Sequence, residues 1–134
     1  MDTREQLRRI VDEAVLLQGL AEDILAGVRA RRSLTELARP GGALVSRFVA
    51  LRAELPATND PLLKPLARTV GETLDHHAMM VASSLDLLGD LRPERVAHLI
   101  DTLDGLGPPA QRLCALQAEL AGEGISAPPA RQPI

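Results

Sequence analysis

Apolar residues recur at steps of three and four along most of this chain of 134 residues. This spacing gathers them on one side of an α-helix, which turns once every 3.6 residues. Strict alternation of apolar and polar residues, the pattern of a half-buried strand, is missing, and Val, Ile, Thr and aromatic residues do not cluster. The sequence therefore predicts an all-α protein.

Proline and glycine interrupt this periodicity and divide the chain into helices. The run Arg39-Pro40-Gly41-Gly42 predicts the end of a short helix, because an interior proline removes a hydrogen bond and glycine is a poor helix former. Pro61 follows two capping residues, Asn59 and Asp60, and proline is favoured at the first helical position. The helices that we expect cover residues 3–31, 43–55, 61–88, 93–106 and 110–121, and residues 34–38 form a short continuation of the first of them.

Segments of this kind, joined by short breaks, predict an up-and-down helical bundle of four to five helices. A chain of this length fits one domain and can bury a core without disulfides or a metal. We expect the bundle to cover residues 1–121. Residues 122–134 contain several prolines and glycines and show no periodicity, so they are expected to form a flexible C-terminal tail.

Composition argues against two classes of partner. The formal net charge is −3, whereas a nucleic-acid-binding domain commonly has a basic excess, and Phe48 is the only aromatic residue on which a base could stack. The apolar runs are far shorter than the ~20 residues that cross a bilayer. We therefore expect neither a nucleic-acid nor a membrane partner.

Two features favour a cytoplasmic, bacterial protein. The first residues, MDTREQLRRIVDE, are charged and contain no apolar signal-peptide core, so secretion is not expected. The single cysteine, Cys114, excludes an intrachain disulfide and is compatible with a reducing compartment. Fourteen arginines against one lysine, Lys64, are typical of a GC-rich bacterial genome.

The adjacent His76 and His77 are the candidates for a functional site. At 100° per residue, His77 falls in the middle of the apolar stripe of its helix, and His76 falls at the edge of the stripe, one turn after Glu72. Adjacent helical residues do not face each other, so the two imidazoles are not expected to bind one ion together. We interpret His77 as a core histidine with hydrogen-bonded ring nitrogens, and Glu72–His76 as a solvated pair.

Two alternatives give these histidines a function. A small ligand, haem or metal could bind in a sensor bundle centred on His77, with His76, Glu72 and Met80 as further ligand-binding candidates. A histidine phosphotransfer protein would instead use His76 or His77. The di-iron bundle pattern is disfavoured, because it needs Glu and His three residues apart on inward faces and the spacing here is four. We assign no catalytic residue, no metal ligand and no cofactor.

The first helix is apolar on two sides, which is unusual for a helix that covers one face of a core. Leu16 and Leu20 lie roughly opposite the main stripe, and Ile24 lies between the two sides. Such a helix is either central in its bundle or shared with another chain. Since no catalytic motif occurs, we predict a non-enzymatic regulatory or adaptor module that binds a protein. The expected partner is a second copy, in a homodimer formed through Leu16, Leu20 and Ile24.

Overall fold

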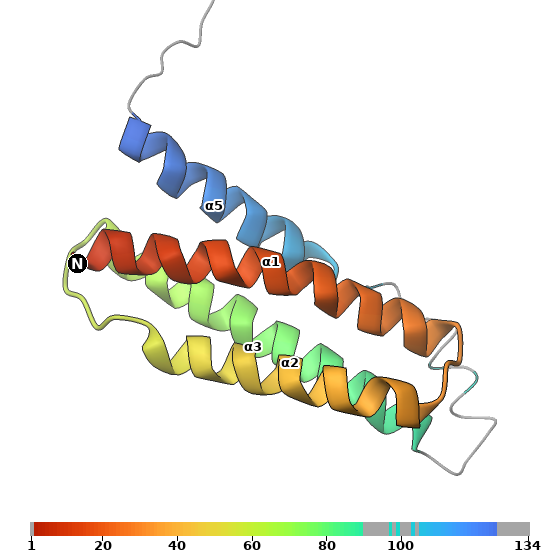
Figure 1. Cartoon of the computed structure of the whole chain (residues 1–134). Helices are drawn as coiled ribbons and strands as arrows, with labels where there is room; N and C mark the ends of the chain where they lie inside the picture. The colour runs from red at the N-terminus through yellow and green to blue at the C-terminus, as the bar shows by residue number, and fades with distance from the viewer. Residues whose placement is uncertain (1, 90–96, 98, 100–102, 104, 126–134) are drawn as a thin grey trace, which may run out of the picture.

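The computed structural model describes residues 2–89, 97, 99, 103 and 105–125, and within this part the chain is all-helical without strands. The helices are α1 (Thr3–Arg29), α2 (Leu34–Glu54), α3 (Leu63–Leu88) and α5 (Pro108–Ile125). Figure 1 shows α1, α2 and α3 side by side with alternating direction, and α5 lying along α1. The predicted up-and-down helical bundle is therefore confirmed.

The first helix begins and ends for local reasons. The Asp2 carboxylate accepts a hydrogen bond of 2.8 Å from the Glu5 N–H and so caps an otherwise unpaired donor of the first turn. The prediction extended this helix to residue 31, but α1 ends at Arg29. Arg31 has a φ of +57°, a left-handed conformation that a right-handed helix cannot continue.

The predicted break at residues 39–42 is wrong, because α2 runs without interruption through Pro40. Its start is held by a capping box, in which Ser33 and Glu36 exchange side-chain to backbone hydrogen bonds. Pro40 lacks one helical hydrogen bond, but packing compensates for this loss. At Gly41 a Cβ atom would lie only 2.6 Å from a methyl carbon of Leu85, so glycine here lets α3 approach α2 closely.

The start of α3 differs from the prediction by two residues. The Asp60 carboxylate accepts a 2.8 Å hydrogen bond from the Leu62 N–H, and the Asp60 carbonyl accepts bonds from the N–H groups of Leu63 and Lys64. Asp60 therefore caps a turn that contains Pro61, and the regular helix follows at Leu63.

The chain after α3 departs from the prediction at three places. Of the helix expected over residues 93–106, Ala97 and Leu99 are helical, Leu103, Gly105 and Leu106 are not, and the others lie outside the described residues. The last helix starts at Pro108 and not at residue 110. Proline has no N–H group, and this causes no loss in the first turn, where N–H groups have no partner within the helix. The helix continues to residue 125, so residues 122–125 of the expected tail are helical; residues 126–134 lie outside the described part.

One hydrophobic core joins all four helices. Phe48 of α2 is fully buried, together with leucine, isoleucine and valine side chains from all four helices and from the loop before α5. The largest of these are Leu7, Ile10, Leu25, Leu51, Leu74, Leu106, Leu113 and Leu120. None of the helices in the described part of the chain combines the length and apolar character that crossing a bilayer demands.

Candidate functional site

His77 lies in the core, as its position in the apolar stripe of α3 predicts. Its side chain is 0% exposed, and the edge of its ring meets the Phe48 ring at an angle of 81° with the centroids 5.5 Å apart. Edge-to-face contacts of this kind are favourable between aromatic rings. The imidazole is thus part of the packing between α2 and α3.

One ring nitrogen of His77 has a clear partner on α1. The Nε2 atom lies 2.8 Å from Oε1 of Gln18, whose amide nitrogen in turn donates to Sγ of Cys114 at 3.4 Å. Because the amide oxygen only accepts, Nε2 of His77 carries the hydrogen and donates. The other nitrogen, Nδ1, is buried and has no hydrogen-bond partner among the described residues. The sequence interpretation, which expected partners for both nitrogens, is therefore correct for Nε2 alone.

Burial keeps His77 neutral at pH 7. It lowers the pKa of His77 from 6.5 to about 4, because the charged imidazolium loses its hydration in the core. Repulsion by His76 lowers this pKa further, and the Thr73 backbone has the opposite, smaller effect. A neutral imidazole with one donor hydrogen bond suits this buried position, since a buried charge would need a partner.

His76 has a different partner from the predicted Glu72. Its Nε2 atom lies 3.1 Å from the carbonyl oxygen of Leu106, in the loop that leads into α5. The same peptide segment is held from α1, because the Leu106 N–H donates to the Glu22 carboxylate at 3.2 Å. Arg29 donates to the carbonyl of Leu103, three residues before Leu106, at 2.8 Å. The two histidines thus have different hydrogen-bond partners, although their ring centroids are 6.0 Å apart.

The four ligand-binding candidates do not surround a common space. Glu72 is exposed and forms no ion pair with His76 among the described residues, so the expected Glu72–His76 pair is wrong. Met80 is half-buried and lines a hollow of about 270 Å³ with Ser83, Leu87 and other side chains, and none of the described residues that line it is a histidine. In the part of the chain that the structure describes, no group of three His, Cys, Asp or Glu side chains could hold a metal ion.

The described residues of α1 and α2 form an apolar groove at the surface. Its volume is about 370 Å³, within the range of ordinary ligand pockets. The walls come from two helices: Leu17, Leu20, Asp23 and Ile24 of α1, and Pro40, Ala43, Leu44 and Arg47 of α2. The sequence prediction missed the α2 wall, because it placed a break at residues 39–42, between Pro40 and the helix that it began at Ala43.

The three predicted interface residues divide between this groove and the surface beside it. Leu16 is 75% exposed and Leu20 is 55% exposed, one helical turn apart on α1. We call these two side chains the ridge. Ile24 is only 7% exposed and lines the groove, so a partner could reach it only from inside the groove.

The two charged side chains that line the groove, Arg47 and Asp23, differ in whether other side chains already contact them. Arg47 forms two hydrogen bonds with the Glu13 carboxylate, one of them 2.7 Å long, and its third nitrogen lies 3.7 Å from Glu54. The hydrogen bond with Arg47 lowers the pKa of Glu13 and raises the pKa of Arg47. Asp23, on the opposite wall, has no ion-pair or hydrogen-bond partner among the described residues.

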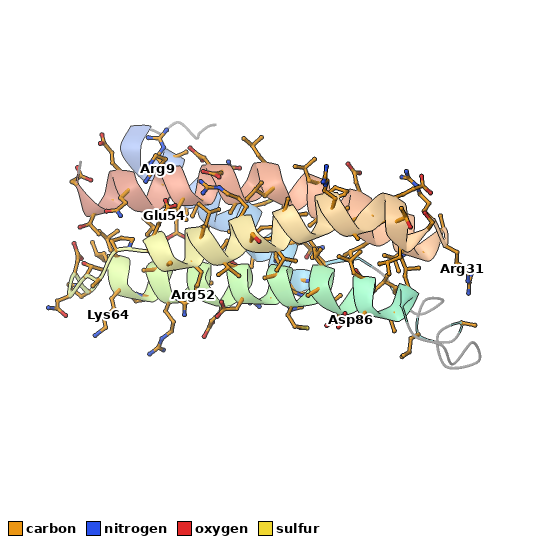
Figure 2. All side chains as sticks on the ribbon, turned by 60° about the horizontal axis from the view of Figure 1, so that its bottom comes forward. Arg9, Arg31, Arg52, Glu54, Lys64 and Asp86 are labelled. Carbon is orange, nitrogen blue, oxygen red and sulfur yellow. The ribbon has the colours of Figure 1, made fainter. Side chains whose placement is uncertain are left out.

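Charges elsewhere are spread along the bundle. Figure 2 shows Arg9, Glu54 and Lys64 toward one end of the bundle and Arg31 and Asp86 toward the other. Contacts within the chain engage basic residues near the end of α1, since Arg32 pairs with Glu36 at 3.1 Å and Arg29 binds the Leu103 carbonyl. Mixed charges of this kind do not indicate a binding site for a polyanion.

Comparisons with protein-family models, with curated proteins and with solved structures gave no match.

Proposed function

We propose that this chain is a non-enzymatic interaction module that associates with a second copy through the α1–α2 face. The observation that carries the proposal is the pair of exposed leucines of the ridge beside an apolar groove. Single exposed apolar residues are ordinary, but a contiguous apolar patch marks a binding surface. Covering it stabilises the complex by roughly 25 cal/mol for each Å² of apolar area removed from water.

The positions of the histidines support a non-enzymatic role over the sensor and phosphotransfer alternatives. A phosphoryl donor needs an accessible ring nitrogen, whereas His77 is 0% exposed and Nε2 of His76 bonds the Leu106 carbonyl. A ligand centred on His77 needs space beside its ring, and His77 lines neither the α1–α2 groove nor the hollows beside Met80 and Lys64. Packing and loop attachment account for both imidazoles.

A cytoplasmic location belongs to the same proposal. Cys114 is a free and exposed thiol. Exposed free thiols are compatible with a reducing compartment, because an oxidising one favours their pairing into disulfides.

Light scattering of the purified protein, with sedimentation equilibrium for the dissociation constant, tests the proposal. We expect the wild-type chain to be a dimer. Substitution of Leu16→Glu or Leu20→Glu is expected to raise the dissociation constant at least about 30-fold, since loss of a central apolar anchor costs about 2 kcal/mol or more. Circular dichroism checks that each variant remains helical.

Val49→Glu is the matched control, because Val49 is 57% exposed on α2 but does not line the groove. This variant is expected to stay dimeric with an unchanged dissociation constant. A wild-type chain that stays monomeric at high micromolar concentration refutes the proposal. A dimer that Val49→Glu weakens as much as Leu20→Glu does would place the interface elsewhere.

A further inference from the structure

The ridge and the groove lie side by side on one chain. Leu20 belongs to both, because it is 55% exposed and also forms part of the groove wall, whereas Leu16 projects outward beside it. In a twofold dimer each surface patch meets its own copy, so that a protruding part must find a hollow in the same patch. This surface supplies both parts within about two helical turns of α1.

The rim of the groove is complementary to itself in charge as well. Asp23 stands on the α1 wall and has no partner among the described residues, and Arg47 stands on the α2 wall. Arg47 uses its Nε and Nη2 atoms for Glu13. Its Nη1 atom lies 3.7 Å from a carboxylate oxygen of Glu54, which is a long contact between partly exposed side chains. A twofold axis that crosses the groove brings Asp23 of one copy toward Nη1 of Arg47 in the other. Opposite charges placed in this way fix the register of an interface.

The walls of the groove argue against direct stacking of α1 on α1. If the ridges of two copies met each other, the α2 wall of Pro40, Ala43 and Leu44 would keep an empty apolar space beside the interface. Side chains that line such a void lose their dispersion contacts on one side. Side chains four residues apart, as Leu16 and Leu20 are, form a ridge of the kind that packs between side chains of a facing helix.

We propose that the dimer pairs ridge with groove about a twofold axis. Leu16 of each copy enters the α1–α2 groove of the other and contacts Ala43 there, and Asp23 of one copy faces Arg47 of the other. This arrangement rests on the proposed self-association and specifies its geometry.

Disulfide cross-linking between two differently tagged chains tests the arrangement. Both chains carry Cys114→Ser, which removes the exposed native thiol. One chain carries Leu16→Cys and the other Ala43→Cys, so that a mixed disulfide can form only between copies. A disulfide needs Cβ atoms about 3.5–4.5 Å apart, which makes its formation a strict test of proximity. Light scattering first establishes that each variant is dimeric at the concentration used.

We expect the mixed disulfide to form faster than the disulfide between two Leu16→Cys chains. Val49→Cys is the control chain and is expected to cross-link with neither partner, because Val49 is exposed but does not line the groove. A dimer without the mixed disulfide overturns the ridge-to-groove arrangement, whether or not Leu16→Cys cross-links with itself, and leaves the proposed function intact. A wild-type monomer refutes the proposed function, and the arrangement with it.

The charge contact has its own test, which leaves the apolar surface unchanged. Asp23→Lys places a like charge opposite Arg47 and is expected to weaken the dimer up to about fivefold at low salt, with the difference shrinking as salt is added. The control is Asp86→Lys, which changes the charge by the same amount at an exposed residue of α3. It is expected to leave the dissociation constant unchanged. An equal effect of the two substitutions overturns the pairing of Asp23 with Arg47.

Discussion

Acidification from pH 7 to 4.5 is expected to destabilise the bundle through His77. Burial of this imidazole lowers its pKa from 6.5 to about 4 in the folded protein. Between these two values the unfolded chain binds a proton at His77 and the folded chain does not. The free energy of unfolding therefore falls as the pH falls, from about 6.5 downward, and the loss levels off below the folded pKa.

The size of the effect follows from the two pKa values. Their difference is 6.5 minus 4, or 2.5, and each unit corresponds to about 1.4 kcal/mol, so the whole window is worth about 3 kcal/mol. Between pH 7 and 4.5 the linkage relation gives a loss of about 2 kcal/mol. This is a large part of the ~5–15 kcal/mol by which a typical domain is stable.

Urea unfolding followed by far-ultraviolet circular dichroism measures this loss. His77→Gln is the comparison, because glutamine does not titrate and can still hydrogen-bond Gln18. We expect the loss between pH 7 and 4.5 to be about 2 kcal/mol smaller in His77→Gln than in the wild type, since the carboxylates that titrate in this range are common to both.

Equal losses in the two proteins would refute the reasoning. An independent measurement on the wild-type chain is the NMR titration of the carbon-bound ring protons of His77. A midpoint close to 4 is expected for the folded protein, whereas a midpoint near 6.5 would show that burial does not act on this imidazole as inferred.

Two pairs of glycine substitutions test the local packing, each by urea unfolding. Gly105 and Gly107 both have positive φ angles, +90° and +75°, so alanine at either position is expected to cost about 1–2 kcal/mol. Gly105→Ala should cost more, because its Cβ would lie 2.7 Å from a carboxylate oxygen of α1, whereas nothing lies within 4 Å at Gly107; equal costs would contradict this contact. Gly42→Ala is expected to stabilise α2 by about 1 kcal/mol, since the position is helical and open. Gly41→Ala should gain less or destabilise, because its Cβ would lie 2.6 Å from a Leu85 methyl carbon, and an equal gain at both positions would refute the close approach of α3.

The helices and the core could largely be predicted from residue spacing. Two of them, α1 and α3, match their predicted bounds to within two residues at each end, and His77 is buried as its place in the stripe of α3 indicates. The failure at Pro40 has a physical cause. Local propensity treats proline and two glycines as a stop, but α2 gains more from packing against α3 and α1 than it loses at one missing hydrogen bond.

The contacts of the histidines could not be predicted in the same way. His77 bonds Gln18, which is 59 residues away in the chain, and His76 bonds a carbonyl 30 residues away. Spacing within one helix suggested Glu72 as the partner of His76, because residues four apart are neighbours on a helix surface. Contacts between different helices depend on how those helices are packed, which local spacing does not contain.

For the interface candidates too, spacing within one helix predicted some properties and the packing of the helices decided the others. The sequence by itself determined that Leu16 and Leu20 lie outside the apolar stripe of α1, since helix geometry places every side chain around the axis. Only the tertiary structure decided that Ile24 lies in a groove and that Pro40 and Ala43 of α2 form its opposite wall. The direction of a side chain from its own helix is a local property, whereas a groove exists only after two helices have taken up a fixed distance and register.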